Sequence, residues 1–164
     1  MGMRKLKLYL DTSVINFIYA DDMPDLQKVT IDFFEDYMKP QKYDAYISDV
    51  VSLEISRTRD QEKRKNLFSI IETYNLRVLP TEREDEIKYL VTKYMEKGII
   101  PKNKIEDALH IAYAVVYEMD YLISWNYRHL ANINKEKRIL LLNEEENYHH
   151  YFRMITPLEV LYEE

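Results

Sequence analysis

The stretch LKLYLDTSV (residues 6–14) decides the fold of this chain. Leu6 to Leu10 is a short, largely apolar run, and it stops at Asp11, Thr12 and Ser13, residue types that cap helix N-termini. A helical turn is predicted directly afterwards, from Val14 to Tyr19. A strand that passes at once into a helix is typical of α/β proteins with a parallel sheet.

The same alternation continues through the chain. Further strands are predicted over residues 44–48, 76–80, 121–124 and 152–155. Helices are predicted over 25–38, from the cap at Asp49 to about 73, from the cap at Thr81 to 97, and over 104–118 and 135–145. Right-handed crossovers between such strands give an α/β fold with a mainly parallel sheet of four or five strands flanked by helices.

Composition narrows the class of protein. The 164 residues are 46% hydrophobic and 32% charged, with 2 Gly and 5 Pro, which predicts one globular domain over residues 1–164. The absence of cysteine excludes a disulfide scaffold, a thiol nucleophile and a Cys-ligated metal site. No apolar run has the length of a membrane span, so we expect a cytoplasmic protein without a membrane partner.

Four oxygen-bearing side chains fall where ligands gather in such folds, outside the carboxyl ends of the strands. Asp11 and Asn126 follow strands, Glu54 lies one turn into a helix, and Asp107 lies in the first turn of another helix. Carboxylates packed together repel one another unless cations neutralise them, and Mg²⁺ and Mn²⁺ prefer oxygen ligands. The net charge of −6 argues against non-specific coating of nucleic acid, but not against an enzyme that meets phosphate through such ions.

Taken in order, four segments of the chain resemble the PIN domain. They are Leu10 to Ile15, the single residue Glu54, Glu106 to Ala112, and Leu122 to Asn126. The resemblance extends from about Leu6 to Pro157, nearly the whole chain. It implies a PIN fold, and a metal-dependent ribonuclease of the kind found in many VapC-type toxins.

Carried over by position, the resemblance implies the catalytic and metal-binding residues. Asp11, Glu54, Asp107 and Asn126 would hold one or two Mg²⁺ or Mn²⁺ ions, with Thr12 or Ser13 in support. The expected activity is hydrolysis of RNA phosphodiester bonds by a water that the metal activates. The resemblance further implies the toxin of a type II toxin–antitoxin pair, with an antitoxin protein as partner and a homodimer as the assembly.

Each residue also has a structural interpretation. Asp11 could serve only as a helix cap, Glu54 could pair with Arg57, and Asp107 could only complement a helix dipole. For His110, the favoured interpretation is a packed histidine hydrogen-bonded inside the fold rather than a metal ligand. Arg57, Arg59 and Arg128 would guide RNA phosphates toward the site, or belong to solvated surface.

A second functional hypothesis comes from Asn126. An amide in place of a carboxylate removes one negative charge from the site and holds a cation more weakly. The alternative is therefore a PIN-like RNA- or protein-binding module with weak catalysis. Metal-dependent cleavage of RNA, and its loss in Asp11→Asn and Asp107→Asn, separates the two hypotheses.

Overall fold

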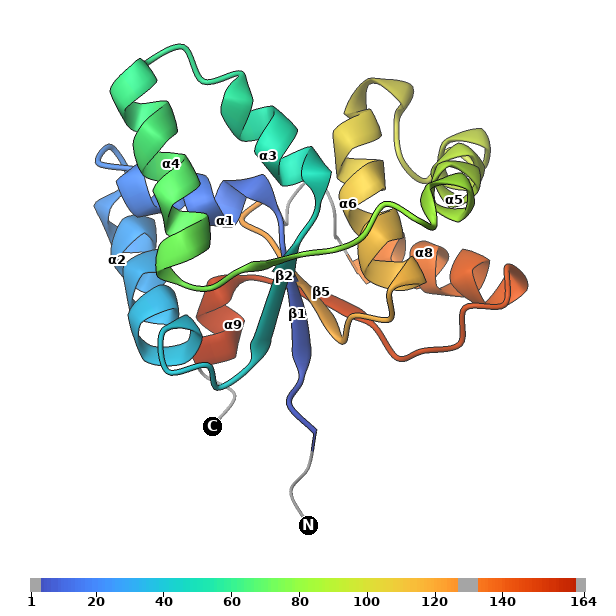
Figure 1. Ribbon diagram of the computed structural model, residues 1–164. Coiled ribbons are helices and arrows are strands. Elements are labelled where there is room, and N and C mark those ends of the chain that lie inside the picture. Colours follow the sequence, from blue (N-terminus) through green and yellow to red (C-terminus); the bar gives the residue numbers. More distant parts are fainter. Residues whose placement is uncertain (1–3, 127–132, 162–164) are drawn as a thin grey trace.

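The computed structural model describes residues 4–126 and 133–161, and its architecture is α/β (Figure 1). One sheet is built from five short strands: β1 (Lys7–Leu10), β2 (Asp44–Ile47), β3 (Arg77–Val78), β4 (Tyr121–Ile123) and β5 (Arg153–Ile155). Every pairing between neighbouring strands is parallel. The predicted fold class, a parallel sheet flanked by helices, is confirmed.

The strand order β3-β2-β1-β4-β5 sets the position of the site. From β1 the chain moves outward to β2 and β3, then returns to the other side of β1 to form β4 and β5. The direction of winding therefore reverses between β1 and β4. Ligand crevices in open α/β sheets form at such a reversal, outside the carboxyl ends of the two strands.

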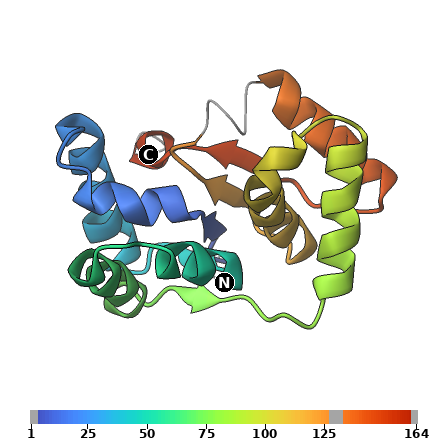
Figure 2. The ribbon, with the colours of Figure 1, turned by 90° about the horizontal axis from the view of Figure 1, so that it is seen from above.

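Helices cover both faces of the sheet (Figures 1 and 2). Leu8 and Leu10 of β1 point to one face, where a buried cluster includes side chains from α1 (Thr12–Asn16), α2 (Pro24–Phe33), α4 (Gln61–Thr73) and α9 (Pro157–Leu161). Tyr9 points to the other face, toward α5 (Glu84–Glu96), α6 (Ile105–Val116) and α8 (Ile133–Glu145). The period of two in a strand divides these side chains between two cores.

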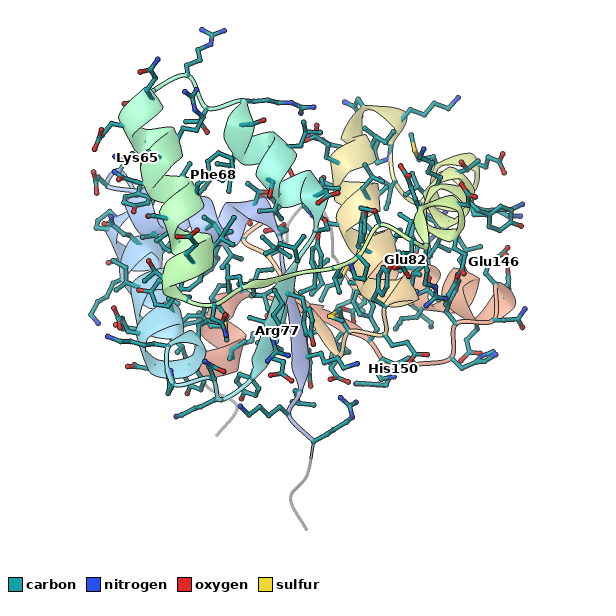
Figure 3. All side chains as sticks on the ribbon, in the orientation of Figure 1. Lys65, Phe68, Arg77, Glu82, Glu146 and His150 are labelled. Atoms are coloured by element: carbon teal, nitrogen blue, oxygen red, sulfur yellow. The ribbon has the colours of Figure 1, made fainter. Side chains whose placement is uncertain are left out.

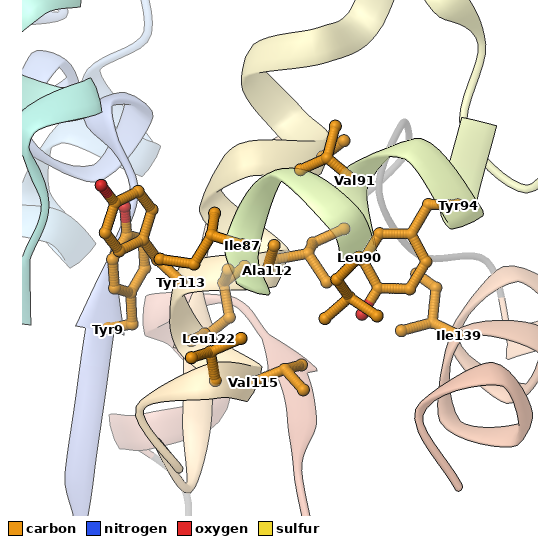
Figure 4. Close-up of a cluster of buried hydrophobic side chains, with 14 of the residues drawn as sticks. Tyr9, Ile87, Leu90, Val91, Tyr94, Ala112, Tyr113, Val115, Leu122 and Ile139 are labelled. Atoms are coloured by element: carbon orange, nitrogen blue, oxygen red, sulfur yellow. The ribbon is translucent and has the colours of Figure 1, made fainter. Parts of the chain in front are cut away.

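In the core on the face of the sheet to which Tyr9 points, helix α6 packs between the sheet and α5 (Figure 4). Tyr9 and Leu122 come from the sheet, Ala112 from α6, and Leu90 and Tyr94 from α5, and all five are buried. Most of α6 is buried, which explains its apolar sequence. Its first turn nevertheless carries Glu106 and Asp107, at the same edge of the sheet as the carboxyl ends of the strands.

The long helix predicted from Asp49 to about residue 73 is wrong, because the structure has two helices there. Helix α3 (Asp49–Ser56) ends before a turn, and α4 begins anew after Asp60, whose carboxylate accepts from the backbone N–H groups of Glu62 and Lys63. Helix α3 is itself capped by Ser48 rather than by Asp49. Ser48 has the extended backbone that a cap requires, so Asp49 is already helical.

Three smaller features complete the description. Helix α5 begins at Glu84 rather than at the predicted cap Thr81, and the predicted stop at Gly98 is confirmed by its φ of +68°. Short helical turns occupy Phe17–Tyr19 and Lys102–Lys104, and α2 continues as a π-helical turn over Phe34–Met38. Within residues 4–126 and 133–161, no helix is both long and apolar enough to cross a bilayer.

Candidate active site

Asp11 lies at the reversal of the strand order. Its backbone N–H donates to the carbonyl of Ile123 at 3.2 Å, which extends the pairing of β1 with β4 by one bond. Its side chain is only 1% exposed and caps α1 by accepting from the N–H of Ser13 at 3.0 Å. Asp11 is therefore a helix cap, and it is also a carboxylate at the position where this class of sheet binds ligands.

Two serine hydroxyls hold the Asp11 carboxylate. Ser13 Oγ donates to Oδ1 at 2.5 Å and Ser124 Oγ donates to Oδ2. The same hydroxyls accept from the backbone N–H groups of Trp125 and Asn126, each at 2.9 Å. The segment after β4 is thus fixed to Asp11, and Asn126 comes to the mouth of the site.

The charge of Asp11 is poorly compensated. Burial raises its pKa, as does the charge of Asp107, and these outweigh the nearby His110 charge and the serine hydrogen bonds, which lower it. Among the described residues, no lysine or arginine forms an ion pair with this carboxylate. A buried carboxylate without a basic partner is expensive, and a bound cation would remove the cost.

Glu54 enters the site from α3. Its Oε1 accepts from Thr12 Oγ1 at 2.9 Å and lies 2.5 Å from His110 Nε2. Burial raises the pKa of Glu54, but the contacts with His110 and Thr12 outweigh burial and leave the pKa below its usual value. The ion pair of Glu54 with Arg57 is not formed, because Arg57 pairs with Glu106.

A buried chain of hydrogen bonds lies behind Glu54. His110 is 2% exposed, and its Nδ1 lies 2.7 Å from the Tyr9 hydroxyl, which lies 2.7 Å from Ser48 Oγ. Burial lowers the pKa of His110, but the Glu54 contact and the charges of Asp11, Glu54 and Asp107 raise it overall. The predicted packed, hydrogen-bonded histidine is confirmed, and its Nε2 proton points at the carboxylate of Glu54.

Asp107 and Asn126 line one cavity of about 460 Å³. Its other described lining residues are Asn103, Lys104, Ile105 and Glu106, from the turn before α6 and from the first turn of α6. Asp11 is linked to this cavity through Ser124 and Asn126, and its pKa responds to the charge of Asp107. The structure thus brings the four sequence-predicted residues to one edge of the sheet.

The donor atoms suit a hard cation, since carboxylate, amide and hydroxyl oxygens are the ligands that Mg²⁺ and Mn²⁺ prefer. In the part of the chain that the structure describes, however, no three His, Asp or Glu side chains are already arranged to hold a metal ion. Oxygen Oε1 of Glu54 already has two partners, as has the Asp11 carboxylate. The chemistry of the donor set fits the metal, while assembly of the ligands requires side-chain movement.

The three arginines predicted to guide RNA differ in how the structure describes them. Arg57 is partly neutralised by Glu106, at the edge of the cavity. Arg59 is exposed in the turn between α3 and α4. Arg128 lies outside the described residues. Farther along, Lys65 projects from the outer side of α4, with α3 between α4 and α6 (Figures 1 and 3).

Comparison with solved structures shows a likeness in fold. No protein-family model matches the chain, and no curated protein matches it. The chain is similar to one in the crystal structure of VapBC2 from Rickettsia felis bound to a DNA fragment from their promoter, with a TM-score of 0.57 and 17% identity. The match covers 92% of this chain and 98% of that chain. The likeness is one of fold.

Sequence reasoning missed several members of the site, among them Ser124, which holds the Asp11 carboxylate. Tyr9 and Ser48 are hidden in or just after strands, and their neighbours in sequence gave no polar signal. Glu106 also belongs to the site, because it lines the cavity and pairs with Arg57. A tyrosine at an inward strand position, two residues before the candidate aspartate, was the available signal for the buried chain.

Proposed function

We propose that this chain is a metal-dependent endoribonuclease of the PIN type, a single domain that hydrolyses RNA phosphodiester bonds. The observation that carries the proposal is the buried Asp11 carboxylate at the reversal of the strand order, without an ion-pair partner among the described lysines and arginines. Asp107 and Asn126 line a cavity beside it. The likeness in fold to a VapBC2 chain supports a nuclease at a coarse level.

In this proposal Asp11, Glu54, Asp107 and Asn126 hold Mg²⁺ or Mn²⁺. When bound, such an ion lowers the pKa of water and stabilises charge that develops on phosphate oxygens. Ser13 and Ser124 fix the orientation of Asp11, since the hydroxyl of each donates to a different oxygen of the carboxylate. Thr12 and His110 fix Glu54 through its Oε1, so both carboxylates are preoriented by groups from other elements.

The substrate would approach at the carboxyl ends of β1 and β4. Arg57, Arg59 and Arg128 are proposed to contact phosphates of the strand outside the cavity, where they add affinity but no sequence preference. Arg57 does this only in part, because Glu106 shares its charge.

A role as the toxin of a toxin–antitoxin pair follows from the same likeness, since the similar structure is titled as VapBC2 with promoter DNA. We therefore propose an antitoxin protein as partner, a homodimer as the assembly and the cytoplasm as the compartment. Light scattering of the purified chain, alone and after co-expression with the product of an adjacent small reading frame, tests the two assemblies.

The activity is tested by cleavage of a long single-stranded RNA by the purified chain in Mg²⁺, in Mn²⁺ and in EDTA. Wild type is compared with Asp11→Asn and Asp107→Asn. The matched control is Asp85→Asn, because Asp85 lies in the first turn of α5 as Asp107 lies in the first turn of α6. We expect discrete, metal-dependent cuts by wild type and Asp85→Asn, and none by the other two.

The control separates catalysis from helix stabilisation. Equal losses in Asp85→Asn and Asp107→Asn would assign Asp107 to the helix dipole alone. Cleavage unchanged in every variant would mean a contaminating nuclease and would remove the site assignment. RNA binding without cleavage by wild type would favour the second candidate, a PIN-like binding module, which the amide at Asn126 supports.

A further inference from the structure

The cavity beside Asp107 presents an electrostatic problem for an anionic substrate. Glu106 and Asp107 both line it, and Asp11 lies close enough to Asp107 for the two charges to interact. A phosphodiester carries a negative charge on every nucleotide, so its approach to these carboxylates is repulsive. A cation on the cavity wall would reduce this repulsion.

Among the described residues, one basic side chain lines this wall and a second contacts a lining residue from outside it. Arg57 forms an ion pair with Glu106, so much of its charge is already used. Lys104 lines the cavity from the helical turn Lys102–Lys104, and across the described residues its ammonium group has no ion-pair or hydrogen-bond partner. Lys104 is therefore the described cation on this wall whose charge remains available.

The backbone holds Lys104 close to the candidate ligands. Its N–H donates to the carbonyl of Pro101 at 2.9 Å, and α6 begins at the next residue. Asp107 follows three residues later, in the first turn of the helix. The lysine and the aspartate are thus fixed on one rigid element, and their relative position does not depend on a long loop.

The rest of the lining suits a nucleotide. Asn103 and Asn126 present amide donors and acceptors, and among the described lining residues none is aromatic. The volume of about 460 Å³ lies within the range of roughly 300–1,000 Å³ usual for small-ligand pockets. Recognition here would therefore use charge and hydrogen bonds rather than stacking of bases on rings.

We propose that this cavity is the subsite for one nucleotide of a single-stranded RNA, with Lys104 bound to a non-bridging oxygen of its phosphate. Asn103 hydrogen-bonds the sugar or base of the same nucleotide. The inference rests on the proposed ribonuclease function and goes beyond it, because it assigns the phosphate contact inside the cavity to Lys104, while the arginines contact phosphates outside it.

The test measures RNA affinity separately from cleavage. A fluorescein-labelled single-stranded RNA of mixed sequence is titrated with the full chain in EDTA, over a series of salt concentrations, and followed by anisotropy. Wild type is compared with Lys104→Gln and with Lys102→Gln. Lys102 is exposed on the same turn but does not line the cavity, so its replacement removes an equal charge from an adjacent position.

For Lys104→Gln we expect about 5- to 10-fold weaker binding at low salt, and a plot of log affinity against log salt that is shallower by roughly 0.7, the value for one phosphate contact on a single strand. Lys102→Gln is expected to bind within about twofold of wild type, because an exposed lysine outside the cavity contributes only to the general field. The melting temperatures of both variants should match that of wild type.

Each other outcome overturns the inference. Equal losses in the two lysine variants would assign the effect to the overall field of the protein. No loss in Lys104→Gln, with RNA still bound and cleaved by wild type, would refute the subsite and leave the proposed function standing. Failure of wild type to bind RNA in EDTA at any salt would refute the Lys104 contact, and only the additional absence of metal-dependent cleavage would refute the proposed function.

Discussion

Two buried carboxylates, at opposite ends of the sheet, differ in the side chains that neutralise their charge. Asp120 lies at the amino end of β4 and is 6% exposed, and Asp11 lies at the carboxyl end of β1 and is 1% exposed. Asp120 accepts two hydrogen bonds from the Arg4 guanidinium, at 2.8 and 3.0 Å, and one from the N–H of Lys7 at 2.7 Å. His150, at the lower edge of Figure 3, lies 3.0 Å from the same carboxylate.

The pKa values follow these surroundings. Burial raises the pKa of Asp120, but the bonds from Arg4, Lys7 and His150 outweigh burial and lower it overall. At Asp11 burial and the Asp107 charge prevail, so its pKa is raised. Asp120 pairs directly with Arg4, whereas at the other end His110 pairs with Glu54, and none of the described lysines and arginines pairs with Asp11. Asp11 is thus the less compensated of the two buried carboxylates.

The largest expected effect is on catalysis. Asp11→Asn should reduce RNA cleavage about a thousandfold or more, because several kcal/mol of transition-state stabilisation depend on the metal that Asp11 would hold. Asp120→Asn should keep cleavage within about threefold of wild type, since it lies at the other end of the sheet. Single-turnover cleavage rates, measured below the melting temperature of each variant, provide the test. Similar losses of cleavage in both variants would contradict the distinction between Asp11 and Asp120.

The next effect concerns the chain of hydrogen bonds behind Glu54. Tyr9→Phe removes the hydroxyl between His110 and Ser48, and loss of such a supporting partner typically weakens metal affinity or activity about 10- to 100-fold. Calorimetric titration with Mn²⁺ measures the affinity independently of cleavage. The matched control is Tyr94→Phe, because Tyr94 is equally buried but donates to Asn143, away from the site.

Both tyrosine variants should lose stability by about 1 kcal/mol, the usual value of one buried hydrogen bond. Only Tyr9→Phe should bind Mn²⁺ more weakly. Unchanged Mn²⁺ affinity in Tyr9→Phe would reduce the chain to a packing role.

The third effect is on the stability of the fold at the amino end of β4, where Arg4 and His150 contact Asp120. Asp120→Asn should cost about 2 kcal/mol, because the Arg4 and His150 side chains lose their anion, and lower the melting temperature by roughly 4–8 °C. The control Asp44→Asn lies at the amino end of β2 and removes a 3.6 Å ion pair with the exposed Arg77, for which about 0.5 kcal/mol or less is expected. Equal destabilisation of the two variants would mean that burial of Asp120 adds nothing.

The smallest effect is a difference in pH dependence between the two ends, measured by urea unfolding in EDTA. The lowered pKa of Asp120 gives stability that is present above its unfolded pKa, near 3.9, and is lost as the pH falls through the folded value. Asp120→Asn should therefore be less stable than wild type at pH 7, and the difference should disappear in acid.

The pH dependence of stability expected from Asp11 has the opposite sign. Its raised pKa gives stability that is complete below the unfolded pKa and is lost as the pH rises through the folded value. Asp11→Asn should therefore equal wild type in acid and be more stable than wild type at pH 7. A variant less stable than wild type at pH 7 would show that capping of α1 by the carboxylate outweighs its uncompensated charge.

Local patterns predicted most of the fold. The strand at residues 6–10 and the cap at Asp11 depend on neighbouring residues, and both are present in the structure. The break between α3 and α4 was missed, because the cap at Asp60 competes with a sequence that is otherwise compatible with a continuous helix. The alternative interpretation of Glu54, an ion pair with Arg57, is not formed, because Glu106, from a different helix, pairs with the arginine.

By itself the sequence determined the alternation of strands and helices and the placing of acids after strands or at helix starts, since these follow from local propensity and hydrophobic period. Only the tertiary structure decided which side chains form hydrogen bonds with these acids. Ser124 meets Asp11 across 113 positions, and His110 meets Glu54 across 56. Such pairings depend on strand order and helix packing, which no local window contains. For the same reason, only the fold separates the compensated Asp120 from the uncompensated Asp11.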